Sequence, residues 1–175
     1  AVNLKEVVKL SREEARLRAD AKGCTPYDAL LDIFEPDMTS ARLDDLFGDP
    51  KSWLPGLLNQ VVEKQAQQSF VPPQGPFPTA IQRELGLEAM KTLGFDFNAG
   101  RLDVSAHPFC GGVPEDVRIT TRYDEDELLS ALFGVIHETG HARYEQNLPR
   151  NWLGQPIALA RSTAIHESQS LFFEM

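Results

Sequence analysis

Cysteine is scarce in this sequence. Its two cysteines, Cys24 and Cys110, lie far apart and do not form a C-x-x-C pair. This spacing excludes a paired-cysteine motif and predicts two free, partly buried thiols, as in a protein kept in the reducing cytosol.

The sequence also lacks long apolar runs and an excess of basic residues. No stretch of about 18 apolar residues could span a bilayer, and no segment has the basic start and apolar middle of a signal peptide. Acidic residues outnumber basic ones by 26 to 17, which gives a net charge of −9. Nucleic acid and anionic membranes attract basic surfaces, so neither is expected as a partner. We expect a cytoplasmic protein.

The remaining composition is that of a globular domain, with 42% hydrophobic and 25% charged residues. There is no internal repeat or composition break, so residues 1–175 are expected to form a single domain. The first residue is Ala1, and the last segment keeps its helical pattern to Met175 without a cap. We therefore expect the chain to be a portion of a longer protein.

Apolar residues recur at three- and four-residue spacing along most of the chain, which predicts helices. Thr25 is the expected N-cap of the second helix, ahead of Pro26. The predicted helices are residues 3–21, 26–34, 40–69 with interruptions at 48–50 and 55–56, 79–93, 125–147 and 157–175.

Two segments, 101–105 and 117–123, instead alternate apolar and polar residues and are rich in Val, Ile and Thr. They are predicted to be short strands, separated by Gly111-Gly112 and Pro114. Residues 71–78 contain four prolines and are predicted to be a loop. The fold class is therefore mainly α with a small β element.

The chemistry centres on the H-E-x-x-H motif His137-Glu138-Thr139-Gly140-His141. Residues four apart on a helix lie on the same face, so His137 and His141 can bind one zinc ion. Glu138 would then act as the general base toward a metal-activated water. A chance match to the motif, with a buried and hydrogen-bonded histidine pair, is the alternative.

The residues around the motif favour a helix. Asp124 and Glu127 resemble a capping box, and an apolar stretch follows them. Gly140 is unfavourable inside a helix by about 1 kcal/mol relative to Ala. Its presence suggests that another backbone or a substrate passes close by.

A hydrolytic zinc site has three protein ligands and one open position. Glu167, 26 residues beyond His141 on the next predicted helix, is the candidate third ligand. On spacing alone, a solvated Glu167 is an equal alternative. His166 is a competing ligand, but it points about 100° away from Glu167 around the helix.

Four short motifs in this order resemble the thermostable (Taq-type) metallocarboxypeptidase family. They are His107-Pro108-Phe109, Asp116-x-Arg118-x-Thr120, His137-Glu138-x-x-His141 and His166-Glu167-Ser168-Gln169. The resemblance is strong over about residues 80–175 and looser before them.

This resemblance implies a helical, gluzincin-like zinc peptidase with a small antiparallel β element beside the active-site helix. It implies His137, His141 and Glu167 as metal ligands, Glu138 as the catalytic base, and zinc or cobalt as the metal. It also implies a homodimer that removes C-terminal residues, other than proline, from peptides with a free C-terminus.

Two further motifs of that family, Ile-Arg-x-x-Ala-Asp and Gln-Asp-x-His-Trp, are absent from this sequence. They are thought to supply the cation that binds the substrate carboxylate and groups that stabilise the oxyanion. Arg118 is the nearest substitute cation, but it is expected to pair with Asp116 or another strand neighbour. His107 is expected to pack its strand against the site helix, with a contact to a metal ligand or to substrate as the alternative. The alternative function is therefore a metal-binding helical module with little activity until a complementary segment or subunit completes it.

Overall fold

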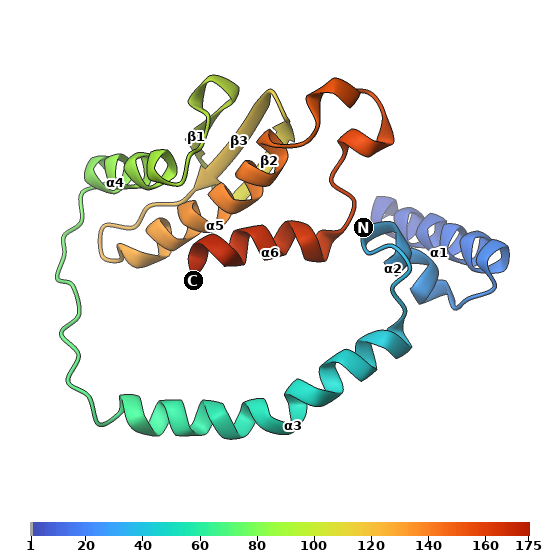
Figure 1. The fold of residues 1–175 in the computed structure, drawn as a ribbon, viewed down its shortest axis with the longest axis horizontal. Coiled ribbons are helices and arrows are strands. Elements are labelled where there is room, and N and C mark those ends of the chain that lie inside the picture. The colour runs from blue at the N-terminus through green and yellow to red at the C-terminus, as the bar shows by residue number, and fades with distance from the viewer. Residues whose placement is uncertain (1) are drawn as a thin grey trace. The chain divides into compact units, whose positions relative to one another are not determined.

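A computed structural model describes residues 2–175. The described chain divides into two compact units, one up to Pro72 and one from Pro73 to Met175 (Figure 1). Among the described residues, no helix combines the length and apolarity needed to cross a membrane. That residues 1–175 form a single domain stays a prediction, and each unit is considered by itself below.

The first unit consists of the helices α1 (Val2–Lys22), α2 (Pro26–Phe34) and α3 (Ser40–Gln65). Thr25 caps α2 as predicted, since its hydroxyl oxygen accepts a hydrogen bond from the backbone N–H of Asp28 at 3.1 Å. Helices α1 and α2 pack against each other. Small residues are the buried ones on these helices: Ala15, Ala19 and Ala29.

The predicted interruptions of the third helix are wrong. Helix α3 runs through Pro50 and Pro55 without ending, and it is bent along its length (Figure 1). Proline inside a helix removes one backbone hydrogen bond and crowds the preceding turn, which kinks a helix without necessarily stopping it.

The second unit is built around one small sheet and three helices. The proline-rich segment 71–78 that precedes them has no helix or strand, as predicted. The main elements of the second unit are α4 (Thr79–Thr92), β1 (Gly100–Val104), β2 (Phe109–Val113), β3 (Asp116–Thr121), α5 (Leu129–Gln146) and α6 (Thr163–Glu174).

The fold class is confirmed as mainly α with a small sheet, but the sheet has three strands in the order β1-β3-β2. The two strands predicted from the sequence, β1 and β3, pair in parallel. The antiparallel neighbour of β3 is β2, which contains Gly111 and Gly112. A Cβ on Gly112 would lie 2.1 Å from the carbonyl oxygen of Asp116, so the tight β2–β3 hairpin requires glycine there.

Helix α5 lies at the centre of this unit. It packs against β2 and β3 of the sheet, against α4 and against α6. Its buried residues, such as Val135 and Ala142, join a core formed with Met90, Phe95, Leu102, Val117 and Ile119. Being packed on several sides fixes the axis and rotation of the helix that carries the H-E-x-x-H motif.

Helices α5 and α6 both begin later than predicted. Leu128 is the N-cap residue of α5, and the carboxylate of Glu127 just before it accepts hydrogen bonds from the N–H groups of Leu129 at 3.0 Å and Ser130 at 2.8 Å. Ser162 caps α6 by accepting from the N–H of Ile165 at 3.0 Å.

Candidate metal centre

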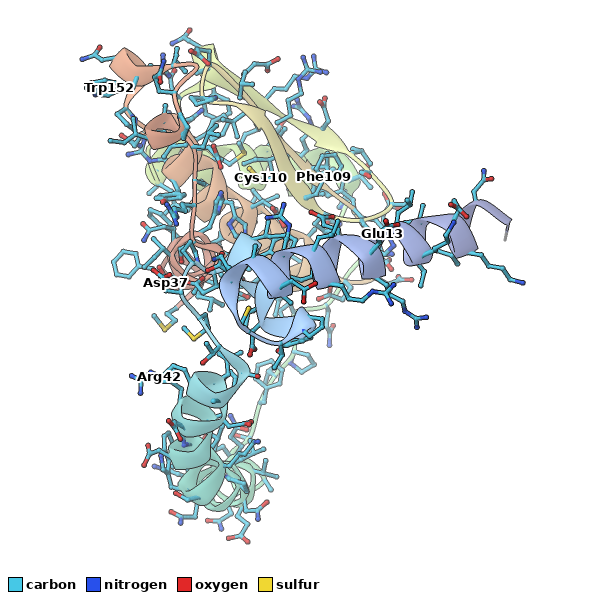
Figure 2. All side chains as sticks on the ribbon, turned by 90° about the vertical axis from the view of Figure 1, so that its right-hand side faces the viewer. Glu13, Asp37, Arg42, Phe109, Cys110 and Trp152 are labelled. Carbon is cyan, nitrogen blue, oxygen red and sulfur yellow. The ribbon has the colours of Figure 1, made fainter. Side chains whose placement is uncertain are left out.

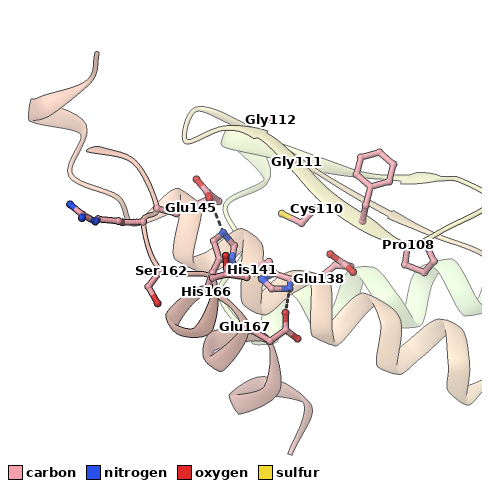
Figure 3. Close-up of a pocket in the computed structure, with 14 residues that line it drawn as sticks. Pro108, Cys110, Gly111, Gly112, Glu138, His141, Glu145, Ser162, His166 and Glu167 are labelled. Carbon is pink, nitrogen blue, oxygen red and sulfur yellow. Dashed lines mark hydrogen bonds and ion pairs between the residues drawn. The ribbon is translucent and has the colours of Figure 1, made fainter. Parts of the chain in front are cut away.

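The H-E-x-x-H motif lies on α5, and its two histidine rings are one turn apart with centroids separated by 5.0 Å. The Nε2 atom of His137 lies 3.4 Å from Glu167 Oε1, and the Nε2 atom of His141 lies 3.4 Å from Glu167 Oε2. Figure 3 shows His141, Glu138 and Glu167 converging where α5 faces α6. The structure thus brings together the three residues predicted as metal ligands.

Glu167 reaches this position because α6 packs closely on α5 at Gly140. A Cβ on Gly140 would lie 2.4 Å from Ser170 Cα and 2.5 Å from the carbonyl oxygen of Gln169. The prediction that another backbone passes Gly140 is therefore confirmed. Ser170 is buried there, and its hydroxyl donates to the backbone oxygen of Glu167 at 2.7 Å and to its Oε1 at 3.2 Å.

This donor set fits a zinc ion. One donor atom from each of His137, His141 and Glu167 lies within 4.8 Å of the other two. Tetrahedral zinc with bonds near 2.1 Å separates its ligand atoms by about 3.4 Å, so only small side-chain movements are needed. Two imidazole nitrogens and a carboxylate oxygen are typical zinc ligands and leave the fourth position open.

Burial shapes the acid–base behaviour of the motif. It raises the pKa of the Glu138 carboxyl; a positive charge on His137 partly opposes this rise, and the nearby Glu167 carboxylate adds to it. Burial also lowers the pKa of His141, and the neighbouring His166 lowers it further. The lowered pKa keeps the His141 imidazole neutral, which is the form that binds a metal.

Each predicted histidine ligand has a partner on the ring nitrogen that faces away from Glu167. Nδ1 of His137 lies 3.0 Å from Glu174 Oε2. Nδ1 of His141 lies 2.6 Å from Nδ1 of His166, and Nε2 of His166 lies 2.8 Å from Glu145 Oε1. His166, considered above as a competing ligand, thus lies behind His141.

Sequence reasoning missed Glu145 and Glu174 as parts of this site. The signal for both was helical spacing: Glu145 follows His141 by one turn, and Glu174 follows Glu167 by two turns on the same face. Such spacing is common among surface carboxylates, so it does not identify a partner until the packing of α6 on α5 is known.

A cavity of about 450 Å³ is lined by Glu138 and by two of the three donor residues, His141 and Glu167. Strand β2, at the edge of the sheet, forms one wall and carries Phe109 and Cys110 (Figure 2). Burial, with the Glu138 and Glu145 carboxylates, raises the pKa of Cys110 to about 12. The lining residues are Pro108, Phe109, Cys110, Gly111, Gly112, Glu138, His141, Glu145, Ala160, Arg161, Ser162, Thr163, His166 and Glu167.

The residues of the other two motifs lie further out. Arg118 pairs with Asp116 as predicted, with Nη2 2.6 Å from Oδ2. The His107 side chain is exposed, so the structure does not place it in packing against the site helix; its backbone oxygen instead accepts a hydrogen bond from the Thr120 hydroxyl at 3.1 Å. Both cysteines are free and partly buried, as predicted.

Comparison with known proteins connects this geometry to one group of enzymes. Thermostable carboxypeptidase 1 of Thermus thermophilus is 42% identical over 179 residues, covering 98% of this chain and 35% of that protein. Carboxypeptidase 1 of Bacillus subtilis is 47% identical over 152 residues, covering 85% of this chain and 30% of that protein. The solved structure of Trypanosoma cruzi metallocarboxypeptidase 1 superposes with a TM-score of 0.88 at 55% identity, covering 98% of this chain and 36% of that one.

The chain thus spans about a third of the length of the relatives that it matches. A family model described as carboxypeptidase Taq (M32) metallopeptidase matches residues 1–175. The chain therefore belongs to the carboxypeptidase Taq (M32) metallopeptidase family.

Proposed function

We propose that this chain carries the metal centre of a carboxypeptidase that hydrolyses the last peptide bond of peptides with a free C-terminus. The observation that carries this proposal is the convergence of the two histidines on Glu167. His137 Nε2 lies 3.4 Å from one carboxylate oxygen of Glu167, and His141 Nε2 lies 3.4 Å from the other. Family membership supports a bound metal and peptide hydrolysis as the reaction, and these three residues form a group that could hold a metal ion.

His137, His141 and Glu167 would hold the metal, which we propose to be zinc, with cobalt as a possible substitute. When bound, zinc lowers the pKa of water and polarises the scissile carbonyl. Glu138, beside the ligands on α5, would accept the proton of that water on its carboxylate and deliver it to the leaving amine. The raised pKa of its carboxyl favours this double role, because it brings proton uptake and release closer to neutral pH.

The cavity beside the ligands is the proposed peptide site. Strand β2 lies at the sheet edge along one wall, where an extended peptide backbone could align with it. Arg161 contributes a guanidinium to the lining, which suits a ligand that ends in a carboxylate. A homodimeric state and a cytoplasmic location stay predictions from the sequence and the resemblance.

A second candidate function is a metal-binding module with little activity alone. The observation that favours it is that this chain covers only 30–36% of the relatives cited above. An assay of the 175-residue chain on an N-blocked dipeptide with a free C-terminus separates the two. Hydrolysis that a chelator abolishes and zinc or cobalt restores supports the enzyme, whereas bound metal without hydrolysis supports the module.

Three variants test the assignment of roles. Glu138→Gln is expected to keep stoichiometric zinc and to lower kcat by about 10²- to 10⁴-fold, because it removes only the proton acceptor. His137→Ala and His141→Ala are each expected to lose zinc and activity together. Elemental analysis of the purified protein and the dipeptide assay provide the two measurements.

Either of two results would contradict the proposal. Full activity of Glu138→Gln would exclude Glu138 as the base. Stoichiometric zinc in a chain that carries both histidine substitutions would exclude His137 and His141 as ligands.

A further inference from the structure

We propose that His166 and Glu145 form a positioning relay that sets the tautomer and the ring orientation of His141. This inference rests on the proposed metal centre. Its basis is a continuous set of contacts in which His141 Nδ1 lies 2.6 Å from His166 Nδ1, and His166 Nε2 lies 2.8 Å from Glu145 Oε1. Figure 3 shows His141, His166 and Glu145 next to one another, in this order, along the wall of the cavity.

Only one arrangement of neutral rings satisfies every contact of the relay. His141 turns Nε2 toward Glu167, so Nε2 must be unprotonated to bind the metal and Nδ1 carries the hydrogen. That hydrogen can be donated only to an unprotonated Nδ1 of His166. The Nε2 of His166 then carries a hydrogen, which it donates to the Glu145 carboxylate.

The relay also connects the two helices that supply all the proposed ligands. His141 and Glu145 lie one turn apart on α5, and His166 reaches them from α6, next to Glu167. The Tyr144 ring packs edge-on against His166 with centroids 4.9 Å apart, which limits rotation of that ring. Losing the relay would therefore loosen His141 and the contact that holds Glu167 opposite it.

The other histidine ligand offers a comparison within the same site. His137 Nδ1 meets Glu174 directly at 3.0 Å, in a more exposed setting. The Glu174 side chain is 37% exposed, against 25% for Glu145 and 21% for His166. Each histidine ligand would thus be held by a carboxylate: His137 contacts Glu174 directly, and His141 contacts Glu145 through the imidazole of His166. Hydrogen bonds of this kind fix ring orientation and raise ligand basicity.

The first experiment uses the unaltered chain loaded with zinc. Proton–nitrogen NMR correlations of the histidine rings report which nitrogen carries the hydrogen. We expect the hydrogen on Nδ1 of His141 and on Nε2 of His166. A hydrogen on Nδ1 of His166 would overturn the relay, because that atom could not then accept from His141.

The second experiment measures zinc affinity by competition with a chelator of known affinity. His166→Leu, which lacks an acceptor, is expected to weaken zinc binding by about 10- to 100-fold, and Glu145→Gln by about tenfold. His166→Asn keeps an oxygen near the Nδ1 position and is expected to recover part of the loss. Glu84→Gln, an equal change of charge at an exposed position on α4, serves as the matched control.

The outcomes separate this inference from the proposed function. If the unaltered chain binds no zinc, the proposed metal centre fails, and the relay fails with it. If the unaltered chain binds zinc and His166→Leu, Glu145→Gln and Glu84→Gln all bind it equally well, the relay alone is overturned. Should the His166 and Glu145 variants not fold, the tautomers of the unaltered chain decide the question.

Discussion

Glu138 combines a proposed chemical role with an unfavourable position. Only 8% of its surface is exposed, and burial raises the pKa of its carboxyl above the ordinary value of 4.5. In the chain without metal, the charged form is therefore less stable in the folded state than in the unfolded state. A group retained for a reaction at the expense of stability is typical of an active site.

The sign of this effect gives a prediction for Glu138→Gln. A carboxyl whose folded pKa is raised contributes stability below pH 4.5, and that contribution is lost as the pH rises through the folded pKa. Glutamine stays neutral throughout. The variant without metal is therefore expected to have a higher free energy of unfolding than the unaltered chain at pH 7.

Urea denaturation of chelator-treated protein at pH 7 and pH 4 measures this difference. The two chains are expected to differ much less at the lower pH, where most of Glu138 is protonated in both states. An equal or lower stability of the variant at pH 7 would contradict the assigned direction of the pKa shift.

At the scale of elements, the packing of α6 on α5 decides whether a metal site exists. The two helices approach so closely at Gly140 that any side chain there would meet the backbone of Gln169 or Ser170. Gly134 lies on the same helix, but its Cβ position has no neighbour closer than 3.9 Å. These two glycines form a matched pair.

We expect alanine to have opposite effects at the two positions. Gly140→Ala should lower the free energy of unfolding by about 1–3 kcal/mol and weaken zinc binding, because α6 must move away with Glu167. Gly134→Ala should raise the free energy of unfolding by about 0.5–1 kcal/mol, since alanine is the better helix former and has room there. Urea denaturation measures the free energy of unfolding, and competition with a chelator measures the zinc affinity. Equal effects of the two substitutions would contradict the close helix contact.

At the scale of the whole molecule, a bound metal should stabilise the folded chain. All three proposed ligands lie in the unit from Pro73 to Met175, on helices that are far apart in an unfolded chain. A metal that binds only the folded state at 100 times its Kd adds about 2.7 kcal/mol to the free energy of unfolding.

Thermal unfolding tests this expectation. Zinc should raise the Tm by roughly 5–10 °C, and a chelator should reverse the rise. Magnesium prefers oxygen ligands and should have a much smaller effect. An equal zinc-induced rise in His137→Ala would mean that zinc stabilises the protein from another site.

The predictions from sequence succeeded where the determining interactions are local. The helical repeat placed His137, Glu138 and His141 on one turn, and the preference of threonine for N-caps placed the start of α2 at Thr25. They failed where two local signals competed. Pro50 and Pro55 predicted breaks, yet α3 tolerates them as a bend.

The sequence by itself determined the paired imidazoles, because residues four apart on a helix must share a face wherever that helix packs. Only the tertiary structure decided that Glu167, whose side chain stays 45% exposed, lies opposite the two imidazoles, because α6 packs against Gly140 and turns Glu167 toward α5. The tertiary structure also decided that β1 pairs in parallel with β3 and that His166 contacts Glu145. Each joins residues distant in sequence, and a linear pattern carries no information about which distant residues meet until the core has set their positions.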